Sequence, residues 1–148
     1  MPLPLNAISA RGHWCNSLVG DFDPDDWFGY IYEIVCTINN RRYVGKKQFR
    51  FLRKKKPLKG RVNKRHSYVD SDWRLYTSSS KHVHNLIDSC GLCNFTFTII
   101  KLCDNKSQLS YYETYFMIHK EVMTLRDASG ELVYLNKQIP AVKCIPKL

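Results

Sequence analysis

The chain has 148 residues and a formal net charge of +10, with 23 Lys and Arg against 13 Asp and Glu. Hydrophobic residues make up 44% and aromatic residues 13%, which is enough for one core and excludes a wholly disordered chain. The most apolar run, residues 95–102, is interrupted by Thr and Lys and is far shorter than the ~20 residues of a membrane-spanning helix. The first five residues do not resemble a secretory signal. We therefore expect a cytoplasmic protein without a membrane partner, whose six cysteines are small buried groups and not disulfides.

The positive charge is concentrated in one segment. Residues 34–69 contain thirteen Lys and Arg and no Asp or Glu, so the rest of the chain has a formal charge of −3. A segment of this kind usually faces a polyanion, which predicts nucleic acid, or another polyanion such as anionic lipid, as the partner. The residues expected to contact it are Lys46, Arg50, Lys54, Lys55, Lys56, Lys59, Arg61, Lys64 and Arg65.

The first regular structure is predicted to be a β-hairpin. Residues 1–27 show weak periodicity and predict an irregular N-terminal arm, whereas residues 28–37 are rich in aromatic and β-branched side chains. Asn39 and Asn40 tolerate the positive φ of a two-residue turn, and residues 41–47 follow as the second strand. This register opposes Tyr32 with Lys47, and it predicts one face that carries Tyr30, Tyr32, Tyr43, Gly45 and Lys47.

The rest of the chain predicts helices around one more strand. The spacing of apolar residues predicts a short helix over residues 48–56, which ends before Pro57, and then an exposed basic loop over residues 58–69. Residues 80–90 and 105–121 predict helices, residues 94–102 a strand and residues 132–135 a short extended piece. The order predicts an α+β fold, with a small antiparallel sheet of about three strands flanked by helices.

Two groups of side chains could carry chemistry. Tyr32 and Tyr43 share a face with Lys47, and an ammonium within about 4–6 Å of a phenol favours the phenolate that a general base needs; a structural role is the alternative. Glu113 lies inside the apolar stripe of its helix, so we expect a cation, a metal ion or strong donors in front of it, unless it pairs at the edge of the stripe. Zinc is not expected, because the single CxxC motif at residues 90–93 has no second ligand pair at zinc spacing.

The order of the motifs resembles the GIY-YIG nuclease superfamily. Gly29-Tyr30-Ile31-Tyr32 is followed, after ten residues, by Tyr43-Val44-Gly45, similar to the G-I-Y and Y-I-G strands of that family with one extra residue, Tyr30. Residues 46–49 and 72–80 are most similar to the phage-encoded GIY-YIG homing-type endonucleases. The resemblance covers residues 28–140, with a basic insert at about residues 54–69, and leaves residues 141–148 as a C-terminal tail.

The resemblance implies a metal-dependent DNA endonuclease that hydrolyses a phosphodiester bond. In this family Tyr32, assisted by Tyr43 and Lys47, would activate a water molecule. Arg53, with Arg50 as the alternative, would stabilise the transition state from a helix after the second strand. Glu113 would hold one Mg²⁺ or Mn²⁺ ion, and the motif positions with structural roles are Gly29, Ile31, Gly45 and Asn136.

Two departures from the family pattern leave alternatives open. Many members carry a histidine a few residues after the arginine, where this chain has Pro57, so His66 or His82 could replace it. We see no separate DNA-binding domain and expect specificity to come from the basic insert, the N-terminal arm, a homodimer or a partner protein. The alternative functions are a non-catalytic nucleic-acid-binding module that uses residues 41–65, and an interaction protein that binds an acidic partner or a membrane surface.

Overall fold

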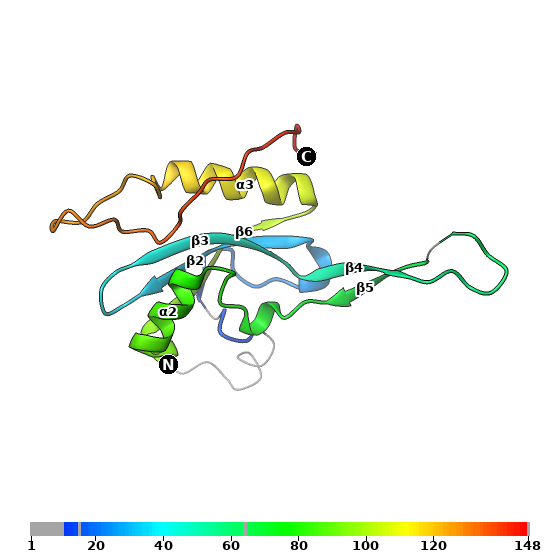
Figure 1. The fold of residues 1–148 in the computed structure, drawn as a ribbon, viewed down its shortest axis with the longest axis horizontal. Coiled ribbons are helices and arrows are strands. Elements are labelled where there is room, and N and C mark those ends of the chain that lie inside the picture. The colour runs from blue at the N-terminus through cyan, green and yellow to red at the C-terminus, as the bar shows by residue number, and fades with distance from the viewer. Residues whose placement is uncertain (1–10, 15, 64, 148) are drawn as a thin grey trace.

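The computed structural model describes residues 11–14, 16–63 and 65–147, which form a sheet with a helix on each face and a projecting arm (Figure 1). The sheet has the order β1-β6-β2-β3, with β1 at Asn16–Ser17, β2 at Gly29–Cys36, β3 at Arg42–Gln48 and β6 at Phe95–Cys103. β2 is antiparallel to both β3 and β6, and β1 adds two parallel residues beside β6. The predicted α+β fold with a three-stranded antiparallel sheet is confirmed.

The hairpin of β2 and β3 has a longer turn than predicted. Asn40, with a φ of 57°, donates its backbone N–H to the carbonyl oxygen of Cys36 at 2.8 Å. Tyr32 therefore opposes Gly45 and not Lys47, so the predicted register is wrong by two residues. Because side chains alternate with a period of two, a shift of two residues leaves every side chain on its predicted face.

The two helices are confirmed, and each begins at a capping residue. α2 spans Lys81–Cys90, where Ser80 accepts a hydrogen bond from the backbone N–H of Val83, and the helix ends at Gly91 with a φ of 87°. α3 spans Lys106–His119 and begins at Asn105. The described part of the chain also contains three short 3-10 helices, η1 at Pro24–Asp26, η2 at Trp73–Leu75 and η3 at Leu92–Asn94.

The sheet separates two hydrophobic cores. The core on the side of α2 is mainly aromatic and contains Trp14, Tyr30, Tyr32, Phe49, Trp73 and Phe97. The core on the side of α3 is mainly aliphatic and contains Ile31, Val44, Leu109, Met117, Val122 and Val133. The alternation along β2 and β3 thus sends the motif tyrosines into one core and their neighbours in sequence into the other.

Residues 50–70 form a second β-hairpin, which projects from the body of the molecule (Figure 1). β4 at Arg50–Lys55 pairs with β5 at Arg65–Asp70 in a two-stranded sheet of its own. The predictions of a helix over residues 48–56 and of an irregular basic loop over residues 58–69 are therefore wrong. Pairing with the aromatic and β-branched residues of β5 stabilises an extended β4, and this tertiary pairing outweighs the weak helical spacing.

Both terminal segments pack against the sheet where they are described. Trp14 is fully buried, and its indole Nε1 donates to the carbonyl oxygen of Trp73, so the predicted N-terminal arm, residues 1–27, contributes to the core. Residues 1–10 lie outside the described part of the chain. At the other end, the backbone N–H of Leu135 donates to the carbonyl oxygen of Arg42 at 2.7 Å, which covers part of the outer edge of β3.

The helices and the cysteines test the predictions that were drawn from composition. None of the helices in the described part of the chain is long and apolar enough to cross a membrane. Among the described cysteines, Cys36 and Cys103 are buried as expected, whereas Cys93 and Cys144 are exposed, which the prediction did not foresee.

Candidate active site

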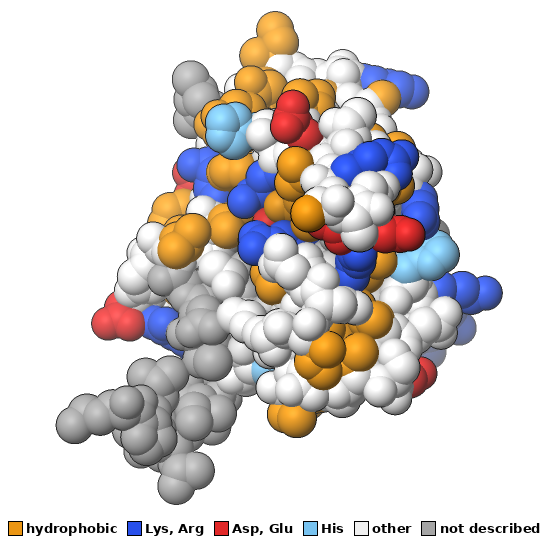
Figure 2. All heavy atoms as spheres, turned by 90° about the vertical axis from the view of Figure 1, so that its left-hand side faces the viewer, with side chains coloured by type: hydrophobic (Ala, Val, Ile, Leu, Met, Phe, Trp, Pro, Cys, Tyr) orange, Lys and Arg blue, Asp and Glu red, His pale blue; other side chains and the backbone are white. Residues whose placement is uncertain are grey.

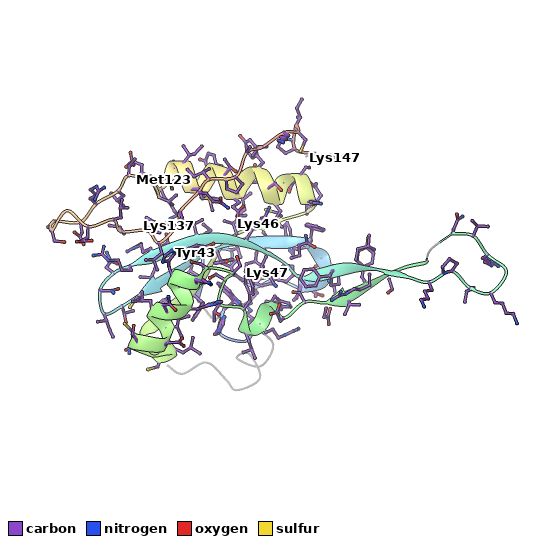
Figure 3. The ribbon with its side chains drawn as sticks, in the orientation of Figure 1. Tyr43, Lys46, Lys47, Met123, Lys137 and Lys147 are labelled. Atoms are coloured by element: carbon purple, nitrogen blue, oxygen red, sulfur yellow. The ribbon has the colours of Figure 1, made fainter. Side chains whose placement is uncertain are left out.

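The candidate site lies around Gly45, where β3 runs between the two cores. Tyr32 of β2 reaches across Gly45, since a Cβ atom at position 45 would lie 2.6 Å from the Cζ of Tyr32. Tyr43 and Lys47 lie on the same side of β3 as Tyr32, whereas Lys46 lies on the side of α3 (Figure 3). The missing side chain at Gly45 lets the Tyr32 phenol lie directly on the edge strand.

Three tyrosines and one serine form a cluster on the side of α2. The side chains of Tyr32 and Ser79 lie close enough to Tyr76 to lower its pKa, and Ser79 lowers that of Tyr43 in the same way. The ring centroid of Tyr32 lies 6.3 Å from that of Tyr43 and 6.1 Å from that of Tyr76. Half of this cluster therefore comes from the segment between η2 and α2.

Burial favours the neutral form of these phenols. Tyr32 is only 1% exposed, and burial raises its pKa well above the usual value for tyrosine, with neighbouring phenols and Glu113 adding to the effect. Burial also raises the pKa of Tyr43 and of Tyr76, but hydrogen bonds from Ser79 oppose the shift. Desolvation thus opposes the phenolate form of Tyr32 that a general base would need, and the activation of Tyr32 stays a prediction.

Lys47 connects the phenol cluster with the root of the arm. Its Nζ lies 2.7 Å from Oδ1 of Asp72, 3.8 Å from the ring centroid of Tyr76 and 5.0 Å from that of Phe51. The Lys47 side chain is 10% exposed, and its hydrogen bond is the main cause that lowers the pKa of Asp72. The ammonium is thus held by one carboxylate and two aromatic rings, which fixes its position.

Glu113 of α3 approaches the site from the other side of β3 and is buried. Its Oε1 lies 3.7 Å from the Nζ of Lys46, which also donates to the Oγ of Ser110 at 3.4 Å. Burial raises the pKa of Glu113, and the charge and hydrogen bonds of Lys46 oppose this. The Glu113 charge in turn raises the pKa of Tyr43 and of Tyr76, so the carboxylate and the phenols are electrostatic neighbours.

Glu113 is the residue that could hold a divalent cation. The described residues contain no group of three or more His, Cys, Asp or Glu side chains placed as metal ligands. Glu33, the other buried carboxylate among them, is occupied by Arg42 at 3.3 Å, Lys120 at 3.3 Å and the Tyr134 hydroxyl at 2.7 Å. A lone carboxylate fits Mg²⁺, which takes one or two carboxylates and completes its shell with water and phosphate oxygens.

The two arginines expected to stabilise the transition state lie outside this cluster. Arg53 is exposed on β4, with its Cζ 6.0 Å from the ring centroid of Phe51, because the helix that would have carried it is a strand. Arg50 is bound at the root of the arm, where its Nη1 lies 3.1 Å from Oδ1 of Asp25. The cations that the described structure places at the cluster are the two lysines of β3.

The remaining predicted DNA-binding residues divide between the arm and the site. Lys46 contacts Glu113 and belongs to the site. Lys56, Lys59 and Arg61 are exposed in the loop that joins β4 to β5. The backbones of Lys54, Lys55 and Arg65 lie on the paired strands, but their side chains, and all of Lys64, lie outside the described residues.

The other motif residues support the backbone of β3. A Cβ at Gly29 would lie 2.5 Å from the carbonyl oxygen of Lys47, and Ile31 is fully buried under α3. The Asn136 amide accepts a hydrogen bond from the N–H of Val44 at 3.0 Å and donates one to the carbonyl oxygen of the same residue at 2.8 Å. Asn136 therefore acts as a neighbouring strand would at this point of the edge.

Three residues of the site were not predicted from the sequence, and the sequence did not decide between two candidate histidines. Tyr76, Ser79 and Asp72 lie in the segment 72–80, which was noted for its resemblance but given no chemistry; the serines next to a predicted helix start were the available signal. Of the two candidate histidines, His82 is exposed on α2, and the side chain of His66 lies outside the described residues.

Comparison with protein families agrees with this geometry. Residues 14–139 match the family model described as "Putative endonuclease segE, GIY-YIG domain". No curated protein and no solved structure matches the chain. The match begins at Trp14, which is fully buried, and includes the hairpin, the arm, Glu113 and Asn136. The chain therefore belongs to the GIY-YIG nuclease family.

Proposed function

We propose that this chain is a metal-dependent DNA endonuclease that hydrolyses a phosphodiester bond at the cluster around Gly45. One observation carries the proposal: a buried carboxylate, Glu113, lies close enough to two half-buried phenols, Tyr43 and Tyr76, for its charge to raise the pKa of both. Hydrolysis of a phosphodiester needs a cation site beside groups that hold a water molecule. In a member of a nuclease family, this cluster is the place that offers both.

Glu113 would hold one Mg²⁺ or Mn²⁺ ion together with phosphate oxygens of the DNA. When bound, such an ion supplies Lewis-acid stabilisation of the charge that develops on the phosphate. Lys46 favours the ionised form of Glu113, since its ammonium opposes the rise in the carboxyl pKa that burial causes. The Lys46 side chain is 39% exposed, so its ammonium can also reach a phosphate oxygen of the substrate.

Tyr43 is the phenol that supports the attacking water best. It is half-buried, its hydroxyl is oriented by Ser79, and it is close to the charge of Glu113. Tyr32 is enclosed in the aromatic core and holds Tyr76 by a hydrogen bond, which makes it a positioning residue. The proposal thus gives Tyr43 the direct role that the sequence pattern assigned to Tyr32.

Cleavage of supercoiled plasmid DNA tests the proposal. We expect nicking with Mg²⁺ or Mn²⁺ and none with EDTA. Glu113→Gln should lower the rate by about a hundredfold or more, because several kcal/mol of charge stabilisation depend on the bound ion. Glu131→Gln, a change at an exposed carboxylate away from the site, is the matched control. DNA binding without cleavage by the wild type would instead support the non-catalytic module.

Two tyrosine variants separate the proposed roles. Tyr43→Phe removes the hydroxyl that would hold the water and should lower the single-turnover rate without changing DNA affinity. Tyr32→Phe removes only the hydrogen bond to Tyr76 and should lower the rate less. A larger loss in Tyr32→Phe than in Tyr43→Phe would reverse this assignment.

A further inference from the structure

Residues 50–70, which include the arm formed by β4 and β5, contain nine of the 23 Lys and Arg of the chain, and the arm stands apart from the body (Figure 1). We propose that this two-stranded ribbon enters the major groove of double-stranded DNA and holds the duplex at the candidate site. The inference rests on the proposed function, since it names the surface that delivers DNA to the site.

The dimensions of the arm suit this groove. Each strand has six paired residues, which at about 3.3 Å per residue gives a ribbon roughly 20 Å long. The major groove of B-DNA is about 12 Å wide and 8.5 Å deep and admits a two-stranded β-ribbon. In the described residues the ribbon pairs with no further strand, and an isolated two-stranded sheet is only marginally stable in water. Contact with a polyanion would stabilise it.

One face of the arm is continuous with the candidate site. Lys47 lies against the ring of Tyr76 in the site and also 5.0 Å from the ring centroid of Phe51 on β4. Arg53, two residues further along the same strand, shares this face and lies 6.0 Å from the centroid of Phe51. A row of alternating rings and cations thus runs from the site onto the arm. Lys47 in this row is largely buried and paired with Asp72, whereas Arg53 is exposed and can contact a DNA backbone.

On the opposite face of the arm, acidic residues neutralise the positive charge where the arm joins the body. Arg50 shares that face with its strand partner Asp70 and forms an ion pair with Asp25 at 3.1 Å. A pocket next to Arg50 is lined by three acidic residues and by Tyr68, which is 70% exposed. Phosphates are therefore attracted to the face that carries Arg53 and repelled near the root of the other face.

Charge at the far end of the molecule is mixed. Figure 2 shows the end that faces away from the arm, where Lys and Arg lie among Asp and Glu. Arg41 pairs there with Asp127 at 2.9 Å, and Lys120 pairs with Glu33 at 3.3 Å. The tip of the arm differs, because its exposed charges at Lys56, Lys59 and Arg61 are all positive. This asymmetry orients DNA toward the arm.

Binding measurements in EDTA, where no cleavage is expected, test the proposal. The tip variant Lys56→Ala/Lys59→Ala/Arg61→Ala removes three exposed charges without touching the core. Its matched control is Lys106→Ala/Arg126→Ala/Lys143→Ala, which removes three exposed charges from the body. We expect wild type and control to bind a 30-base-pair duplex more tightly than the same sequence as a single strand. The tip variant should lose this preference, and its log–log salt dependence should be less steep by roughly 2.7, about 0.9 for each lost phosphate contact.

Methylation of bound DNA by dimethyl sulfate shows which groove the protein occupies. The reagent attacks guanine N7, which lies in the major groove, and adenine N3, which lies in the minor groove. We expect protection of guanine N7 by wild type and its loss in the tip variant. Protection of adenine N3 alone, equal affinity for duplex and single strand, or unchanged duplex binding by the tip variant would each overturn the inference.

Failure of this inference can be told apart from failure of the proposed function. If wild type nicks plasmid with Mg²⁺ but the tip variant binds duplex as wild type does, the arm inference is wrong and the nuclease function stands. If the arm protects guanine N7 but no metal-dependent nicking occurs, the groove inference stands and the endonuclease proposal is wrong.

Discussion

The hydroxyl of Tyr32 occupies the space over Gly45 that a Cβ atom at position 45 would fill. The two residues oppose each other in the hairpin, and Tyr32 is almost completely buried. The pair therefore sets how closely the Tyr32 phenol approaches β3. A glycine is required here by close approach, since no positive φ is needed at this position.

Gly45→Ala should consequently lower both stability and activity. The added methyl group overlaps the Tyr32 ring, and overpacking of this kind costs about 1–3 kcal/mol of unfolding free energy. Displacement of Tyr32 also disturbs its hydrogen bond to Tyr76, so nicking should fall even at temperatures where the variant is folded. Urea unfolding and nicking at low temperature measure the two effects. A Gly45→Ala variant as stable as wild type would contradict the predicted overlap between the added methyl group and the Tyr32 ring.

The acid limit of activity should lie above the ordinary titration range of glutamate. Burial is the largest influence on Glu113 and raises its pKa, and the ionised form is the one that can hold a cation. As pH falls, activity should therefore be lost while exposed glutamates, with pKa near ~4.3, are still ionised. The nicking rate as a function of pH, at fixed Mg²⁺, measures this limit.

Variants of Lys46 supply the control for the pH profile. Lys46→Met removes the ammonium that lowers the pKa of Glu113, so the acid limit should move to higher pH. Lys46→Arg keeps the charge and should leave the limit close to that of wild type. If both variants show the same limit, the ammonium of Lys46 does not control Glu113.

Local signals explain why the helices and the central strands were predictable from the sequence. α2 begins at a serine cap and ends at Gly91, and both signals are encoded within the helix and its immediate neighbours. The facing of Tyr32 and Tyr43 follows from the period of two, so it was correct although the turn at Asn40 is longer than predicted. The position of Glu113 in an apolar stripe indicated a buried carboxylate next to a cation, and the structure places Lys46 beside it.

Non-local contacts explain the errors. Residues 48–56 fit both a helical and an alternating pattern, and the partner strand β5, which decides between them, lies about 15 residues further on in the sequence. Arg53 was therefore placed at the site although it lies on the arm. Tyr76 and Ser79 belong to a connecting segment without periodicity, so only the folded chain shows that they meet Tyr32. Lys46 was predicted only as a DNA contact; its place one residue from Lys47 puts it on the face that α3 covers, where it also pairs with Glu113.

Asn136→Asp should destabilise the edge of the sheet. The Asn136 side chain donates to the carbonyl oxygen of Val44 and accepts from its N–H, and a carboxylate can do only the second. The carboxylate would face the carbonyl oxygen in a buried position, which costs about 1–3 kcal/mol. Urea unfolding compares it with Asn63→Asp, the same change at an exposed position in the arm. Equal midpoints for both variants would contradict the structural role of Asn136.

Glu33→Gln and Glu113→Gln should have opposite effects, although both remove a buried carboxylate on the α3 side of the sheet. Glu33 holds Arg42, Lys120 and the Tyr134 hydroxyl, so its neutralisation should lower the unfolding free energy by about 1–3 kcal/mol. Arg42 and Lys120 are partly exposed, which keeps the loss below that of a fully buried pair.

The Glu113 variant should differ for a reason that follows from its pKa. Its folded-state pKa is raised, so the folded protein loses stability as pH rises through that pKa and the buried group ionises. Glu113→Gln removes this cost and should leave stability at pH 7 equal to or above that of wild type, while nicking is lost. Urea unfolding at pH 5 and pH 7, together with plasmid nicking, separates the two carboxylates. A Glu113→Gln variant that unfolds more easily at pH 7 than wild type would assign to Glu113 the structural role that we reserve for Glu33.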